Sequence, residues 1–98
     1  MKVRNMTSSR GNDIPNQFII WHDDELVING KVYKSARVFQ SYSSTIAVIS
    51  NSGQVVLDYL KWAYSVTTGK YRNQFLGETK KETQAKIDSG EYKLENLN

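Results

Sequence analysis

Apolar residues occur in short runs along the N-terminal half of the chain, and this pattern predicts β-strands joined by tight turns. Phe18–Trp21 is bounded by polar residues on both sides and should form the first core strand. Arg37–Tyr42 alternates in polarity, as a strand with two different faces does. Thr45–Ile49 and Gln54–Leu57 are apolar on both faces, so we expect them to be central strands of a hairpin, with Gly53 in the left-handed conformation in its loop.

The segment Glu25–Lys34 carries the strongest local signal in the chain. Its centre is Asn29-Gly30, and both residues tolerate the positive φ that a type I′ hairpin turn requires. In the register that this turn sets, Val27 faces Val32, and the glutamate and lysine at the two ends face each other. An apolar pair and an oppositely charged pair therefore share one face, which predicts a second β-hairpin here.

Two short helices are expected after the strands. Thr67 or Thr68 can cap a helix that runs to Leu76 and ends at the following glycine. Thr79-Lys-Lys-Glu82 is a capping box for a second helix, and Gly90 is placed to stop it. Because two of the strands are apolar on both faces, the helices should cover the face of the sheet that would otherwise meet water.

These elements predict an α+β fold, with a small antiparallel β-sheet of about five strands (two hairpins) and two short C-terminal helices packed on it. We expect Tyr92–Leu97 to return as an edge strand. Residues 1–16 are rich in Ser, Asn, Gly and basic side chains, so we expect a flexible basic arm, either without a role or docking on a partner. Residues 17–98 then form a single domain, since 98 residues have room for one modest core.

The amino-acid composition indicates which cellular compartment and which kinds of partner to expect. The chain has no cysteine, which excludes disulfides, thiolate zinc sites and cysteine nucleophiles and fits a reducing cytoplasm. Its N-terminus has no apolar run typical of a secretory signal, and no window approaches the roughly 20 apolar residues that span a bilayer. We therefore expect a cytoplasmic protein without membrane contact. The formal net charge of +3 permits a phosphate or acidic protein partner without requiring one.

Few residues offer catalytic or metal-binding chemistry. His22-Asp23-Asp24-Glu25 places potential ligands in a row, but consecutive residues rarely converge on one ion. Thr67-Thr-Gly-Lys70 resembles the end of a phosphate-binding loop, yet Tyr64 and Tyr71 occupy positions where that loop needs Gly and Ser or Thr. No serine has a histidine or buried acid in a pattern that would activate it. We expect no enzyme activity, no cofactor and no metal.

The segment 61–81 is the best candidate for a contact surface, because cations and aromatic rings interleave along it. It carries five cations and one acid, Glu78, together with four aromatic residues. Exposed rings could stack on bases while the cations follow a phosphate backbone, or both could contact a protein. The spacing of Tyr71 and Phe75 favours a different interpretation, in which these rings face the sheet as core. The candidate binding residues are Lys61, Trp62, Tyr64, Lys70, Tyr71, Arg72 and Gln74.

A set of short motifs runs through the chain. They are Phe39-Gln-Ser-Tyr42, Ile46-Ala-Val48, Trp62-Ala-Tyr-Ser65, Thr67–Leu76 and Gly90–Leu97. With these motifs the chain resembles a family of small uncharacterised proteins that phages and prophages of Gram-positive bacteria encode. The likeness covers most of the chain from Asn16 onward and is most specific at Thr67–Leu76. It implies a protein made in the cytoplasm of an infected host cell, and it implies no particular activity.

The residues and the resemblance together leave three hypotheses. The first is a non-enzymatic protein that binds a host or defence protein and modulates or inhibits it, with Trp62–Leu76 as the contact. The second is an accessory protein that binds single-stranded DNA or RNA, with Tyr64 and Tyr71 as stacking platforms. The third is a structural protein that self-assembles through an uncovered strand edge. No pattern in the sequence selects an oligomeric state.

Overall fold

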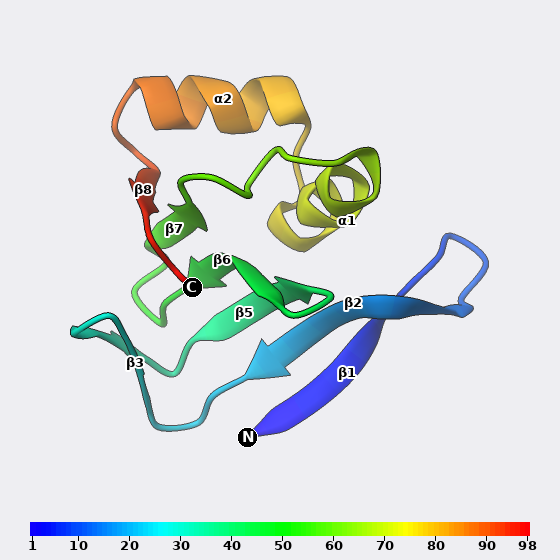
Figure 1. The fold of residues 1–98 in the computed structure, drawn as a ribbon, viewed down its shortest axis with the longest axis horizontal. Coiled ribbons are helices and arrows are strands. Elements are labelled where there is room, and N and C mark those ends of the chain that lie inside the picture. The colour runs from blue at the N-terminus through cyan, green and yellow to red at the C-terminus, as the bar shows by residue number, and fades with distance from the viewer.

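The computed structural model describes all 98 residues and has an α+β architecture, as the sequence predicts (Figure 1). The strands are β1 (Lys2–Thr7), β2 (Asp13–Trp21), β3 (Glu25–Ile28), β4 (Lys31–Lys34), β5 (Arg37–Ser41), β6 (Ser44–Ile49), β7 (Val55–Asp58) and β8 (Lys93–Glu95). The helices are α1 (Val66–Leu76) and α2 (Lys80–Asp88), and both lie between β7 and β8 in the chain. Neither helix has the length and hydropathy needed to cross a membrane.

Six strands form one sheet in the order β1-β2-β5-β6-β7-β8. Neighbouring strands are antiparallel except β7 and β8, which are parallel. Parallel neighbours need a crossover connection, and the segment that contains α1 and α2 supplies it. Figure 1 shows α1 above the middle of the sheet and α2 beyond it, farther from the strands. The predicted C-terminal edge strand is present as β8.

The main core lies between the sheet and α1. Phe39 of β5, Ala47 of β6 and Leu57 of β7 are fully buried in it. Tyr71 and Phe75 of α1 pack into the same cluster, and the ring centroids of Phe39 and Phe75 are 5.9 Å apart. The predicted helical cover over the apolar strands is therefore confirmed for α1, and it fixes which side of this helix faces inward.

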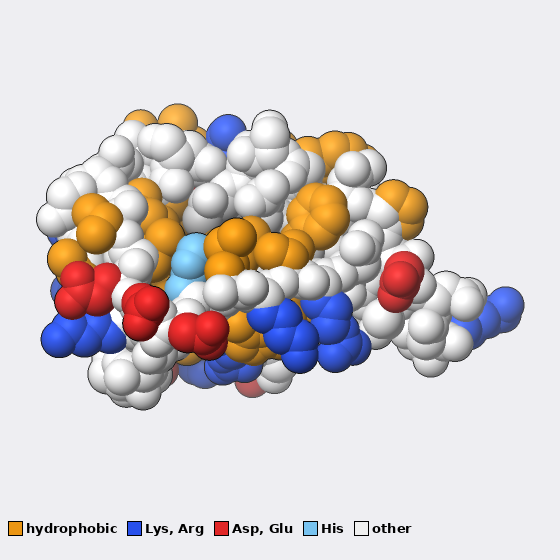
Figure 2. All heavy atoms as spheres, turned by 90° about the horizontal axis from the view of Figure 1, so that it is seen from below, with side chains coloured by type: hydrophobic (Ala, Val, Ile, Leu, Met, Phe, Trp, Pro, Cys, Tyr) orange, Lys and Arg blue, Asp and Glu red, His pale blue; other side chains and the backbone are white.

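The β3–β4 hairpin forms a separate two-stranded sheet and covers part of the opposite face. Its register is the predicted one, and Asn29 and Gly30 have φ angles of 48° and 82° at the turn. Tyr33 of the hairpin packs with Val38 and Val48 in a second buried cluster. The cover is incomplete, because hydrophobic side chains remain visible when the molecule is seen from below (Figure 2).

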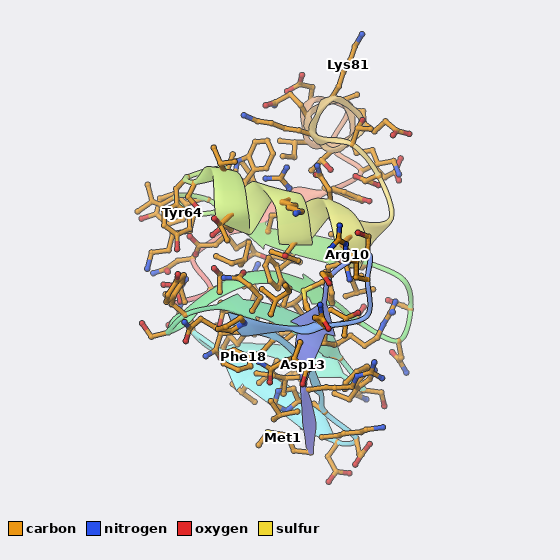
Figure 3. The ribbon with its side chains drawn as sticks, turned by 90° about the vertical axis from the view of Figure 1, so that its right-hand side faces the viewer. Met1, Arg10, Asp13, Phe18, Tyr64 and Lys81 are labelled. Carbon is orange, nitrogen blue, oxygen red and sulfur yellow. The ribbon has the colours of Figure 1, made fainter.

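Residues 1–16 do not form the flexible basic arm that we predicted. They make up β1, the turn after it and the start of β2, and Met6 is 2% exposed in the main core. The prediction failed because strand pairing uses backbone hydrogen bonds, so an edge strand needs few apolar side chains of its own. The folded domain therefore includes the N-terminal residues, and Arg10 lies in the β1–β2 connection (Figure 3).

Local capping signals place the helix ends close to their predicted positions. The capping box of α2 is present, since Thr79 Oγ1 accepts from Glu82 N–H at 3.2 Å and Glu82 Oε1 accepts from Thr79 N–H at 3.0 Å. The cap of α1 is Ser65, two and three residues before the predicted threonines Thr67 and Thr68. Thr68 is buried instead, and its hydroxyl lies 3.0 Å from Ser41 Oγ in β5.

Candidate binding surface

Residues 59–65, termed here the β7–α1 segment, form an anchored turn because Asp58 fixes their start. Oδ2 of Asp58 accepts hydrogen bonds from the backbone N–H groups of Leu60 at 3.2 Å and Lys61 at 3.0 Å. The Asp58 carbonyl accepts from Trp62 N–H at 3.1 Å. An aspartate that bonds the backbone two and three residues ahead stabilises such a turn.

The β7–α1 segment is also held from both neighbouring layers. Lys61 Nζ donates to Ser44 Oγ of β6 at 2.8 Å. From α1, the Arg72 guanidinium donates to the backbone carbonyl of Trp62. These side-chain contacts add to the turn bonds, so the backbone of the segment has a defined position against the sheet and the helix.

Four large apolar side chains on or next to this segment face solvent. Tyr59 is 50% exposed, Leu60 66%, Tyr64 50% and Val66 92%, and we term these four the apolar row. The Trp62 side chain, in contrast, packs against the main core. Single exposed apolar residues are ordinary, but four of them around one anchored turn form a candidate contact surface. Figure 3 shows Tyr64 at the edge of the molecule, beside the start of α1.

Five of the predicted binding residues keep contact with solvent. Tyr64, Lys70 and Gln74 are exposed, whereas Lys61 and Trp62 are partly buried. Tyr64 and Lys70 border one hollow, at the N-terminus of α1. Gln74 borders another, between α1 and the β1–β2 turn, and Lys70 lines this one as well. Lys70 therefore shares one hollow with Tyr64 and another with Gln74, whereas Tyr64 and Gln74 share none.

Tyr71 and Arg72 lie inside the molecule, which corrects the expectation that both contact a partner. Tyr71 is 5% exposed and belongs to the main core with Phe39. Arg72 is 1% exposed and lies 5.2 Å from the centroid of the Trp62 ring, a cation–π arrangement. Its guanidinium also donates to Asn73 Oδ1 at 2.9 Å. The core interpretation of the tyrosine is therefore confirmed, and the cation beside it is buried as well.

Glu78 organises a second cluster of ionisable side chains, next to α2. Its carboxylate accepts from Lys86 Nζ at 2.8 Å, from Tyr92 OH at 2.7 Å and from Thr83 Oγ1 at 2.5 Å. Desolvation acts to raise the pKa of Glu78, but these hydrogen bonds outweigh it, and the pKa lies below its ordinary value. The cluster ties α2 to the residues on both sides of it, so its role is structural.

Sequence analysis overlooked two members of the apolar row, Tyr59 and Leu60, and it did not single out Val66 within the expected contact Trp62–Leu76. The available signal was the pair of large apolar residues directly after the strand-ending Asp58, at a position where a turn has to run over the surface. No group of three or more His, Cys, Asp or Glu side chains is arranged to hold a metal ion. The side chains that this surface offers to a partner are the apolar row and the exposed lysine Lys70.

Comparison with known proteins gives one match. The model of a family of unknown function (DUF8033) matches residues 1–91 of the chain. The matched part contains β1 to β7 and both helices, and therefore the whole of the β7–α1 segment. Neither a curated protein nor a solved structure matches the chain significantly.

Proposed function

The chain belongs to the DUF8033 family, and we propose that it is a non-enzymatic protein that binds another protein through the apolar row. One observation carries the proposal: Leu60 and Val66 are 66% and 92% exposed beside a backbone that Asp58 holds in place. Apolar side chains gain free energy when they leave water, and a protein partner would bury them.

The ordered backbone of the β7–α1 segment is a second reason to expect a binding role, in addition to the exposure of its side chains. A loop that orders only on association loses conformational entropy at that moment, which weakens the complex. Here the turn is ordered beforehand by the hydrogen bonds to Asp58 and by the bond between Lys61 and Ser44. Tyr59 and Tyr64 add the residue type that is enriched in protein interfaces, because a ring gives large contact area with few rotatable bonds.

A host or defence protein of the infected cell is the partner that we propose, with the chain modulating or inhibiting it. The support is the resemblance of motifs such as Thr67–Leu76 to proteins encoded by phages and prophages. A small protein without a catalytic group can act on such a target by occupying its surface. The net charge of +3 favours a target with an acidic patch near the contact.

The burial of Tyr71 and Arg72 favours a protein over single-stranded nucleic acid. A nucleic-acid surface needs rings that stack on bases and cations that reach phosphates. Of the residues that the sequence offered for these tasks, Tyr71 is 5% exposed and Arg72 1%, which leaves Tyr64 as the exposed ring beside Lys70. Beside the exposed lysines, this part of the chain presents the four side chains of the apolar row, which a protein partner would bury.

The test is capture of a partner from the lysate of a Gram-positive bacterium, with half of the lysate treated with nuclease. Three baits are compared: the natural chain, the double variant Tyr59→Ser and Leu60→Ser, and the control Val27→Ser and Val32→Ser. The control removes apolar side chains of similar exposure, 59% and 52%, from the β3–β4 hairpin.

We expect the natural chain and the hairpin control to retain the same protein in both halves of the lysate. The Tyr59 and Leu60 variant should lose it while keeping the circular dichroism spectrum of the folded chain. Retention by that variant would contradict the proposed contact surface. Loss of all captured material after nuclease treatment would contradict a protein partner and point to nucleic acid.

A further inference from the structure

A hollow borders β4 on the face of the sheet that the β3–β4 hairpin covers in part, and we term it the β4 slot. Its volume of about 530 Å³ lies within the range of roughly 300–1,000 Å³ that is typical of ligand pockets. The hairpin and the β6–β7 turn, which form two of its sides, both lie at the left of Figure 1. The slot is lined by Lys31–Lys34 of β4, residues 50–52 and Gln54 of the β6–β7 turn, Val56 of β7, and Lys93 and Glu95 of β8.

One hydrogen bond shows that the outer edge of β4 faces the slot. The N–H of Asn51, in the β6–β7 turn, donates to the carbonyl of Lys34 at 3.0 Å. Backbone groups of residues two apart in a strand point to the same side, so the N–H and C=O of Val32 also point away from β3 and toward the slot. The hairpin register agrees, because Ile28 and Lys31 flank the two-residue turn and exchange hydrogen bonds, whereas the next pair along does not.

The outer edge of β4 has backbone groups that a further strand could pair with. β3 is the strand that pairs with β4, in a sheet of two strands. The Lys34 carbonyl is taken by Asn51, which leaves the N–H and C=O of Val32 and the N–H of Lys34 on this edge. An extended chain lying beside β4 would exchange two hydrogen bonds with Val32 and accept a third from the Lys34 N–H.

The position of β4 beside the slot is fixed at both ends of the strand. The bond from the β6–β7 turn holds one end. At the other end, Lys31 forms an ion pair with Glu95 of β8, and Asn29 Nδ2 in the hairpin turn donates to the carbonyl of Asn96 at 2.8 Å. The strand between these contacts has four residues, which is about 13 Å of extended chain. The slot therefore suits a short extended segment.

The charge of the lining indicates which segment fits. The lining contains three lysines and one acid, Glu95, which is already paired with Lys31. Lys34 and Lys93 are exposed and take part in none of the three ion pairs of the structure. A second copy of β4 would bring its own lysines to this edge, where like charges repel. Acidic side chains beside β4 would instead meet opposite charge.

We propose that the β4 slot binds an extended acidic segment of a protein, which adds to β4 as a third strand of the small sheet. Hydrogen bonds to Val32 and Lys34 hold its backbone, and carboxylates on it contact Lys34 and Lys93. The Val32 carbonyl needs a donor, which a peptide backbone supplies and a free anion such as phosphate does not. The inference goes beyond the apolar row, because none of the four side chains of that row lines the slot.

The direct test follows the backbone amide signals of Val32 and Lys34 in proton–nitrogen NMR spectra of the full chain. The probe is a capped peptide of alternating Glu and Val residues. One control peptide has Gln in place of Glu, a second has methylated backbone nitrogens that cannot donate, and inorganic phosphate is titrated separately. We expect both amide signals to shift saturably with the Glu peptide and their hydrogen exchange to slow. The Gln peptide should bind roughly tenfold more weakly, through the loss of its exposed ion pairs.

Two variants show whether the slot itself binds the probe. Val32→Pro removes an N–H that points away from β3 and should weaken binding of the Glu peptide by about tenfold, equivalent to the loss of one backbone hydrogen bond. Lys93→Glu reverses a charge in the lining without altering the hairpin and should weaken binding by about threefold. Lys81→Glu, at an exposed position of α2 outside the slot, is the control for net charge and should leave the affinity unchanged.

Several results would overturn the proposal. They are unmoved Val32 and Lys34 signals, equal binding of the methylated peptide, unchanged affinity in Lys93→Glu, and tighter binding of phosphate than of the Glu peptide. Shifts of the same two signals with rising protein concentration and no peptide would assign the edge of β4 to a second copy of the chain, and would overturn it as well.

The two proposals fail in different ways. Tyr59 and Leu60, which the capture experiment changes, do not line the slot, and Val32→Ser in the capture control keeps the backbone groups of that residue. If capture depends on Tyr59 and Leu60 but the Glu peptide does not bind, only the β4 slot is refuted as a site. If the peptide binds at Val32 but no captured protein depends on Tyr59 and Leu60, the proposed contact surface is refuted and the β4 slot stands.

Discussion

Asp58 and Leu97 are joined by a hydrogen bond, in which Oδ1 of the buried carboxylate accepts the backbone N–H of Leu97 at 2.9 Å. The other carboxylate oxygen accepts from Leu60 and Lys61 at the start of the β7–α1 segment. One side chain therefore connects the C-terminal end of the chain to the turn that presents the apolar row. The proposed contact surface depends on the packing of residues that lie far from it in sequence.

Asp58→Asn should destabilise the fold by about 1–3 kcal/mol, because the amide keeps one acceptor oxygen and leaves buried N–H groups unpaired. Urea unfolding measures the change. Asp13→Asn, at an exposed position, is the matched control and should change stability by less than about 0.5 kcal/mol. Equal stability of the two variants would show that Asp58 does not anchor the segment.

The Glu78 cluster predicts a pH-dependent contribution to stability. The folded-state pKa lies below the ordinary value of 4.5, so the contribution is present above that value and is lost as pH falls through the folded pKa. Glu78→Gln should therefore be less stable than the natural chain near pH 7, by about 1–3 kcal/mol. This difference in stability should shrink as pH falls through the folded-state pKa of Glu78, because the carboxylate then takes up a proton.

Urea unfolding of the natural chain and of Glu78→Gln at several pH values tests this prediction. Glu91→Gln, at an exposed position, is the control and should show no comparable trend. The natural chain and Glu78→Gln could instead differ in free energy of unfolding by the same amount at neutral and acidic pH. That result would contradict the claim that the negative charge of Glu78 stabilises the fold.

Replacing Gln17 by an apolar residue should stabilise the core. Its side chain is 0% exposed, and neither its amide oxygen nor its amide nitrogen has a hydrogen-bond partner. Gln17→Leu should raise the free energy of unfolding by about 1 kcal/mol, because it removes an unpaired buried polar group. Gln40→Leu is the comparison, since Gln40 donates to the Tyr42 carbonyl at 2.7 Å, and it should not stabilise. Thermal unfolding of both variants measures the two changes in stability, and a loss of stability in Gln17→Leu would contradict the prediction.

Two glycines of the α1 region should respond to alanine in opposite directions. Gly69 is inside the helix with a helical backbone, so Gly69→Ala should stabilise the chain by about 0.5–1 kcal/mol. Gly77 ends the helix with φ of 70°, where a side chain is strained, so Gly77→Ala should destabilise it by about 1 kcal/mol. Thermal melts of the two variants measure both effects, and shifts of the same sign would contradict the backbone assignment.

Sequence patterns predicted those parts of the fold that neighbouring residues determine, namely turns and helix ends. Asn29-Gly30 set the register of the β3–β4 hairpin, and the Thr79–Glu82 capping box marked the start of α2. The N-terminal strand was missed because its pairing with β2 is made by backbone groups that carry no side-chain pattern. The single apolar residue that enters the core from it, Met6, was too little to reveal a strand.

The candidate site was only partly predictable for a related reason. Helical spacing placed Tyr71 inward, but it did not show that Arg72 would be covered by Trp62 and the β7–α1 segment. That cover is tertiary packing between distant elements. The exposure of Leu60 and Val66 depends on the same packing, because apolar residues in a sequence are first expected inside.

Site-specific photocrosslinking tests the central claim most directly. Because the chain contains no cysteine, Leu60→Cys and Val27→Cys each offer one attachment point for a benzophenone label. In nuclease-treated lysate, we predict that the label at position 60 crosslinks one protein and that the label at position 27 does not crosslink it. Equal crosslinking of that protein from both positions, or none from position 60, would contradict the assignment of the apolar row as the contact surface.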